Sequence, residues 1–113
     1  MAKFIEVRKD KGALPFITLN VINSKKGKVL TLYISAAAME KLRFPERIGI
    51  RISEDAALIE IWKDKRGWKV TRAARAGSVR CNKLLPLIGF LSGRIRYDLQ
   101  GRGEKGYVFA RAA

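Results

Sequence analysis

The sequence predicts an α+β domain that is mostly antiparallel β, either a curved sheet or a small pseudo-symmetric barrel, with two short helices. Apolar and polar residues alternate over several short stretches, which is typical of strands with one buried face. Polar turn segments separate these stretches at hairpin spacing. The length of 113 residues is that of one ordinary domain, so residues 1–113 are expected to form a single unit.

The first hairpin is predicted by two alternating stretches, residues 16–22 and 29–35, and by the polar, glycine-containing loop 23–28 between them. A short strand is expected before this hairpin, over residues 4–8. An edge strand leaves backbone groups open to pairing, which makes a second copy of the chain a candidate partner.

A short helix is expected next, over residues 36–42. Ser35 is placed to cap its exposed N–H groups, and Pro45 ends it. Strands are then predicted over residues 47–53 and 57–62, joined by an acidic turn.

The second half of the chain is predicted to contain a loop, a helix and a last pair of strands. Residues 73–78 are small and basic, so a flexible loop is expected there. Asn82 is placed to cap a helix over residues 83–91. Strands are expected over residues 94–99 and 107–111, where apolar and polar residues alternate again.

Two segments of the chain share a layout. Ser35 precedes Arg47 by twelve residues, and Asn82 precedes Arg94 by twelve residues as well. Each segment runs from a cap through a short helix into a basic strand, a turn and a closing strand. A duplication of this kind predicts a pseudo-symmetric barrel built from two strand–helix–hairpin units.

The run from residue 32 to residue 61 resembles the layout of AbrB-like swapped-hairpin barrels, with a strand, a capped helix, a basic strand, a turn and a strand. The whole chain is also similar to single-stranded-DNA-binding coactivator folds, in which curved strands carry basic residues and a helix braces the back. Both resemblances concern architecture, and no site residue is transferred from either family.

The charge of the chain is strongly unbalanced. It contains 24 Lys and Arg against 10 Asp and Glu, which gives a formal net charge of +14. Internal pairing cannot neutralise this excess, and a polyanionic ligand is the usual reason for such a surface. Residues 65–113 hold half of the cations but only two of the acids, so the contact surface is expected mainly in this half.

Basic residues lie on the polar faces of two predicted strands. Arg94 and Arg96 alternate with apolar residues in one strand, and Arg47 and Arg51 do so in another. Side chains at this spacing point to the same side of a strand, so the four arginines are expected to form a basic stripe on a common face.

Aromatic and basic residues are mixed in residues 62–69, which are predicted to form a hairpin with Trp62 and Trp68 near its ends. Exposed aromatic rings stack on the bases of single strands while nearby cations hold the phosphates. The alternative is that both indoles cover the edge of the core. The glycine-rich segment 101–106 is expected to be a flexible hairpin loop whose cations contact a nucleic-acid backbone. The candidate nucleic-acid-binding residues are Arg47, Arg51, Trp62, Lys63, Lys65, Arg66, Trp68, Lys69, Arg72, Arg94, Arg96, Arg102 and Lys105.

Enzymatic chemistry is not expected from this composition. The chain has no histidine, and its one cysteine, Cys81, is expected to be buried in a core strand. Neither a metal site nor a cofactor is expected, because Cys and His ligands and phosphate-binding motifs are lacking. The adjacent acids Glu54 and Asp55 are expected in a solvated turn.

The chain shows no apolar signal segment and no stretch long enough to span a membrane, so a cytoplasmic protein without membrane contact is expected. The expected function is binding of DNA or RNA, with single strands favoured, mainly through phosphate contacts. Two alternatives remain open. One is a protein-interaction module for an acidic or ribosomal partner, and the other is a metal-dependent nuclease whose scattered acids converge on a divalent cation.

Overall fold

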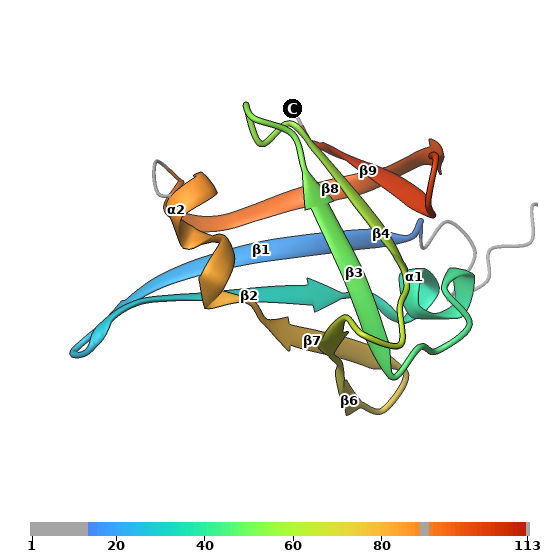
Figure 1. The fold of residues 1–113 in the computed structure, drawn as a ribbon, viewed down its shortest axis with the longest axis horizontal. Coiled ribbons are helices and arrows are strands. Elements are labelled where there is room, and N and C mark those ends of the chain that lie inside the picture. Colours follow the sequence, from blue (N-terminus) through green and yellow to red (C-terminus); the bar gives the residue numbers. More distant parts are fainter. Residues whose placement is uncertain (1–13, 89–90, 113) are drawn as a thin grey trace, which may run out of the picture.

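The computed structural model describes residues 14–88 and 91–112 (Figure 1). The strand expected over residues 4–8 lies outside the described residues. In chain order the elements are β1 (Phe16–Ser24), β2 (Gly27–Ile34), α1 (Ala36–Lys41), β3 (Arg47–Ile52), β4 (Leu58–Lys63), β5 (Trp68–Lys69), β6 (Thr71–Ala73), β7 (Ala76–Arg80), a 3-10 turn at Asn82–Leu84, α2 (Leu85–Ile88), β8 (Gly93–Arg102) and β9 (Tyr107–Arg111).

The described strands form one antiparallel sheet that curves into a nearly closed barrel. Their order across the sheet is β5-β3-β4-β9-β8-β1-β2-β7-β6. The two strands at the ends of this order, β5 and β6, are consecutive in the chain and separated by Val70 alone. Val70 is buried and donates its backbone N–H to the carbonyl of Glu46, 2.9 Å away. The two edges of the sheet therefore meet at Val70, which marks the seam of the barrel.

The order of the elements is compatible with the two-unit layout that the duplication predicts, with β5 as an element outside the two units. The series β1, β2, α1, β3, β4 corresponds in order to β6, β7, α2, β8, β9. Equivalent strands pair with each other, β2 with β7 and β4 with β9. The two helices lie at opposite ends of the sheet (Figure 1). The mostly antiparallel α+β class is therefore confirmed, and the barrel describes the sheet better than an open curved sheet.

One apolar core fills the barrel. The alternating residues of β1 and β2 point inward from both strands, and those of β8 complete this wall. Tyr97 is fully buried and donates its hydroxyl to the carbonyl of Ala56 at 2.6 Å, so the core leaves this polar group satisfied. The largest fully buried side chains are Tyr97, Phe109, Ile17, Leu30, Leu32, Ile34, Met39, Ile48, Ile59, Ile61, Ile88 and Val79.

The predicted first helix and its cap are confirmed. The Ser35 hydroxyl accepts the backbone N–H of Ala38 at 3.1 Å and that of Phe16 at 3.0 Å, which ties the helix start to β1. At the other end, Arg43 donates its N–H to Glu40 O and Phe44 donates to Met39 O. This pairing is a Schellman motif, in which a left-handed residue usually follows the helix.

The prediction of a flexible loop over residues 73–78 is wrong. This segment contains the tight turn of the β6–β7 hairpin. Its small residues serve close packing. A Cβ atom on Gly77 would lie 2.8 Å from Val70 Cγ1 and 2.9 Å from Met39 Sδ, so α1 and the seam approach the backbone of β7 directly. Composition alone does not distinguish such contact from flexibility.

The second helix begins later than predicted, at Leu85 after the 3-10 turn, and Asn82 does not cap it. The Asn82 carboxamide oxygen accepts the backbone N–H of Leu30 at 2.8 Å and so fastens the chain to β2. Cys81 beside it is buried, as expected, but it follows the end of β7 and is not part of a strand. Burial raises the pKa of its thiol to about 12. Within the described residues, no helix combines the length and the apolar character that crossing a membrane requires.

Candidate nucleic-acid interface

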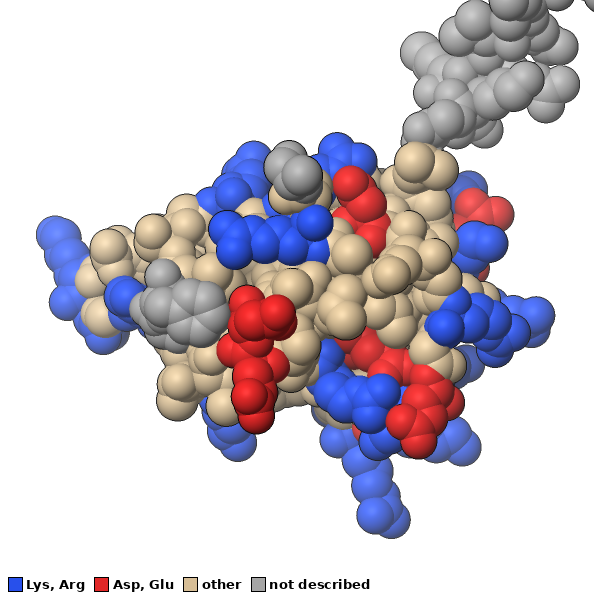
Figure 2. All heavy atoms as spheres, turned by 90° about the horizontal axis from the view of Figure 1, so that it is seen from above, with Lys and Arg blue, Asp and Glu red and all other residues tan. Residues whose placement is uncertain are grey.

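The four arginines expected on a common face do not form one stripe. Arg47 and Arg51 lie on β3, whereas Arg94 and Arg96 lie on β8. The strands β4 and β9 separate β3 from β8 in the sheet. Because the sheet is curved into a barrel, strands three positions apart face different directions (Figure 1). Figure 2 likewise shows acidic and basic side chains together on one face, with wide uncharged areas between them.

The prediction of a hairpin over residues 62–69 is wrong as well. The strand β5 pairs with β3 and not with β4, so β3 lies between the two tryptophan-bearing strands. Trp62 is opposite Gly49, and Trp68 is opposite the adjacent residue Ile48. Neighbouring residues of a strand point to opposite faces, so the two indoles lie on opposite sides of the sheet. Trp68 packs against the core, and Trp62 lies on the outer side.

Trp62 is held between the backbone of β3 and a cation. A Cβ atom on Gly49 would lie 2.1 Å from Cε2 of the indole, so the ring rests directly on the glycine. The Lys105 ammonium lies 4.7 Å from the centre of the Trp62 ring, within the range of a cation–π contact. Both contacts make Trp62 part of the packing of the β8–β9 loop against β4.

The Gly49→Ala variant is expected to be less stable than the wild type by about 1–3 kcal/mol, because the added methyl group overlaps the indole and displaces it. Urea unfolding followed by circular dichroism measures the difference. Gly101→Ala is the matched control, since a Cβ atom there meets nothing within 4 Å. Equal midpoints for the two variants would contradict the close contact between Gly49 and Trp62.

The glycine-rich loop between β8 and β9 binds a carboxylate of the protein, that of Glu60. Glu60 points to the outer side of β4, yet only 4% of it is exposed. Its Oε2 accepts the backbone N–H groups of Lys105 at 2.6 Å and Gly106 at 2.9 Å, and its Oε1 accepts a hydrogen bond from Arg51. Burial alone raises the pKa of Glu60, but these hydrogen bonds and the Arg51 charge outweigh it and lower the pKa below its usual value.

The partners of Glu60 account for two of the predicted site residues. Arg51 is paired with Glu60 and lies 3.5 Å from the carboxylate of Glu104, so its charge is balanced within the molecule. Lys105 covers Trp62, as described above. Arg102 lies 5.6 Å from the centre of the Tyr107 ring at the start of β9. These residues stabilise the loop in the folded protein.

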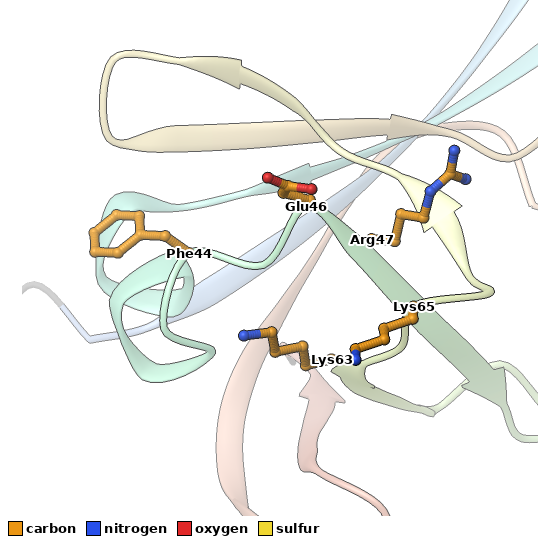
Figure 3. A pocket seen from close by; sticks show the side chains of 5 residues that line it. All are labelled: Phe44, Glu46, Arg47, Lys63 and Lys65. Carbon is orange, nitrogen blue, oxygen red and sulfur yellow. The ribbon is translucent and has the colours of Figure 1, made fainter.

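Five other predicted cations come together around Phe44. Two hollows of about 470 and 220 Å³ share Phe44, Glu46 and Arg47 in their walls. In Figure 3 the Lys63 side chain extends towards the α1 side of the hollow, and the Lys65 side chain runs towards Lys63. The Phe44 ring and the Arg47 guanidinium point away from the two lysines, on opposite sides. We call the basic residues that line the two hollows the Phe44 cluster; they are Arg47, Lys63, Lys65, Lys69 and Arg72.

The seam of the barrel assembles the Phe44 cluster. Arg47 begins β3 and is directly opposite Lys69 of β5, and Arg72 follows in β6 on the other side of Val70. Lys63 ends β4 and Lys65 lies in the turn after it. The closing of the sheet thus brings cations from the ends of four strands and one turn to a single place.

The carboxylates of the described residues do not neutralise the charges of the Phe44 cluster. Glu46 is the one acid in the walls of the two hollows, and among the described residues none of the five cations has a carboxylate within ion-pair distance. Arg47 donates to the carbonyl of Gly67 at 3.1 Å. The Arg72 guanidinium lies 4.7 Å from the centre of the Phe44 ring. Both contacts orient the guanidinium groups and leave their charge in place.

Phe44 reaches its position through an unusual backbone. Arg43 has φ 61° and Phe44 has φ 50°, two consecutive left-handed residues of which neither is glycine. The left-handed conformation costs about 1–2 kcal/mol for each such residue, and strain of this kind is concentrated at functional sites. The strained turn brings the aromatic ring next to Arg72.

The remaining predicted residues lie elsewhere. Arg66 lines a separate hollow with Trp68 and Lys83. Arg96 is paired with Asp98 at 2.7 Å and lies 4.1 Å from the centre of the Phe16 ring. Neither residue contributes to the walls of the Phe44 hollows.

Two groups of residues that line hollows in the structure were not among the predicted site residues. Phe44 and Glu46 were hidden because nothing in the sequence marks the left-handed turn, where glycine would be usual. Arg94 lines a hollow of about 210 Å³ with Thr18 and Tyr33, which lie on two other strands. The period-two pattern contains the signal for Tyr33, since it alternates with the inward residues Leu32 and Ile34.

Within the described ranges, no three acidic or cysteine side chains lie close enough together to hold a metal ion. No family model matches the chain, and no curated protein or solved structure shows significant similarity to it.

Proposed function

We propose that the protein binds nucleic acid without chemically altering it, and that the Phe44 cluster is its main phosphate-binding site. The proposal depends on one observation above all: five cations that have no carboxylate partner among the described residues line two adjoining hollows beside an aromatic ring. Positive charge gathered at this density repels itself, and a polyanion relieves the repulsion. Nucleic acid is a common polyanion that suits such a site.

The side chains of the Phe44 cluster fit phosphate groups. Arg47 and Arg72 offer planar forks of donors that match phosphate oxygens, and the three lysines add mobile point charges. The larger hollow, of about 470 Å³, has room for a backbone phosphate and its sugar. Contacts of this kind fix the position of a strand and carry no sequence information, so binding with little sequence preference is expected.

Binding is expected to be tight at low salt and to weaken steeply as salt is added. Five phosphate contacts on a single strand give a slope of log K against log salt of about −3.5, so affinity should fall on the order of 100-fold between 50 and 200 mM salt. Fluorescence anisotropy with labelled 20-nucleotide DNA, RNA and duplex DNA measures this dependence. The same mixtures with Mg²⁺ or EDTA, run on a denaturing gel, test for cleavage.

Three results would overturn the proposal. The first is no binding of any oligonucleotide at 50 mM salt. The second is Mg²⁺-dependent cleavage, which would make the protein a nuclease. The third is equally tight binding of poly-glutamate of the same charge, which would favour an acidic protein as the partner.

A further inference from the structure

The outer side of four neighbouring strands, β8, β1, β2 and β7, forms a second surface with a different character. Residues that are directly opposite each other in an antiparallel pair point to the same side of the sheet. The row Ile95, Leu19, Leu32, Val79 is buried in the core, so the rows next to it face outward. These outward rows consist of Arg96, Thr18, Tyr33 and Ser78 in one case, and of Arg94, Asn20, Thr31 and Arg80 in the other.

Tyr33 stands at the centre of this surface with 43% of its area exposed. The helices α1 and α2 lie at the ends of the sheet and not over this side (Figure 1). A hollow of about 210 Å³ between Tyr33, Thr18 and Arg94 borders the ring. Planar ligands stack on exposed aromatic rings of this kind.

Among the described residues, two arginines without carboxylate partners lie on either side of Tyr33. Arg94 on β8 and Arg80 on β7 lie on opposite sides of the ring. Three strand spacings separate the two residues, which corresponds to about 14 Å. The acid of the neighbouring row, Asp98, is paired with Arg96. Arg94 and Arg80 have no carboxylate partner among the described residues.

The hairpin of β1 and β2 extends this surface beyond the body of the barrel (Figure 1). Ile22 and Val29 are opposite each other on the outward side, and 49% of Ile22 is exposed. Lys25 and Lys26 are exposed in the turn at the tip. The apolar pair Ile22 and Val29 therefore lies between the surface around Tyr33 and the basic tip of the hairpin.

We propose that single-stranded nucleic acid lies across this surface with a base stacked on Tyr33 and with phosphates held by Arg94 and Arg80. The arrangement follows the general chemistry of single-strand binding, in which aromatic rings on a sheet stack on unpaired bases and flanking cations hold the backbone. Base faces in a duplex are stacked on one another, so Tyr33 discriminates in favour of single strands. This inference rests on the proposed function and names its ligand more closely.

The test compares Tyr33→Ala with Tyr33→Phe on a single-stranded and a duplex oligonucleotide at 100 mM salt. Stacking of one base is worth about 1–3 kcal/mol, so Tyr33→Ala should weaken single-strand binding about 5- to 150-fold. Tyr33→Phe keeps the ring and should bind like the wild type. Duplex binding should change less than twofold in both variants.

Leu58→Ala is the matched control, because Leu58 is exposed to a similar extent, 41%, but lies on β4. Circular dichroism spectra and melting temperatures verify that each variant is folded. Unchanged single-strand binding by Tyr33→Ala would overturn the stacking site, and so would an equal loss on duplex. Absence of all binding by the wild type would instead overturn the proposed function, so the two failures are distinguishable.

Discussion

Replacing Lys63, Lys65 and Lys69 together by alanine is expected to weaken binding of a single-stranded oligonucleotide on the order of 100-fold at 50 mM salt. The three lysines line the hollows around Phe44, and none has a carboxylate partner among the described residues. Each phosphate contact on a single strand contributes about 0.7 to the slope of log K against log salt, so the magnitude of this slope should fall by about two.

The control for this variant removes the same charge elsewhere. Lys41, Lys83 and Arg111 are exposed and lie outside the Phe44 cluster, so their joint replacement by alanine also lowers the net charge by three. Its salt slope should stay close to that of the wild type. If both triple variants lose affinity equally, the overall field of the protein drives binding and the assignment to the Phe44 cluster is wrong.

Most of the strands and the first helix were predictable because their signals are local, whereas β7 begins inside a segment that was expected to be a loop. Alternation places Leu30, Leu32 and Ile34 on one side of β2 whatever the rest of the chain does, and Ser35 caps α1 through a group three residues away. The equal spacing from Ser35 to Arg47 and from Asn82 to Arg94 predicted a barrel of two units, but the two residues are not equivalent, because Asn82 accepts a hydrogen bond from Leu30 of β2 and does not cap the second helix.

The partners of the strands were not predictable in the same way. The turn before Trp68 predicts that the chain reverses its direction, and a hairpin with β4 is the simplest interpretation of this signal. In the structure the chain instead crosses over the end of β3, since Arg47 and Ile48 still have a free edge that β5 fills. Whether β5 pairs with β3 or with β4 depends on the arrangement of the whole sheet. The residues of the turn do not indicate which of the two strands is the partner.

The candidate site was predicted by residue type and only in part by position. Lys63, Lys65, Lys69 and Arg72 were expected together because they are close in sequence, and the seam of the barrel then adds Arg47. Arg51 was expected on the same surface, but Glu60 and Glu104 engage it. Pairing of this kind depends on tertiary contacts, which composition counts cannot reveal.

Glu60→Gln is expected to lower the free energy of unfolding by about 2–3 kcal/mol at pH 7, because hydrogen bonds to a charged group are among the stronger ones. Glutamine has one acceptor oxygen, so its NH₂ group must face either Arg51 or the amides of Lys105 and Gly106, which are donors themselves. Urea unfolding at pH 7 measures the loss.

The pH dependence of the wild type gives an independent test of the same carboxylate. The pKa of Glu60 is lower in the folded protein than its usual value of 4.5, so the unfolded chain takes up the proton first as the pH falls. The stability that Glu60 contributes is therefore complete above about pH 4.5 and is lost as the pH falls through the folded-state pKa. In Glu60→Gln this part of the acid sensitivity should be absent.

Glu104→Gln separates burial from charge in this comparison. It removes the same charge beside the same Arg51, but Glu104 is 80% exposed and lies 3.5 Å from the guanidinium. Exposed pairs contribute little, so Glu104→Gln should lose less than about 1 kcal/mol and keep the acid sensitivity of the wild type. If the two variants are equally stable at pH 7, the loop amides do not depend on Glu60, and the glycine-rich loop is the flexible connection that its composition suggests.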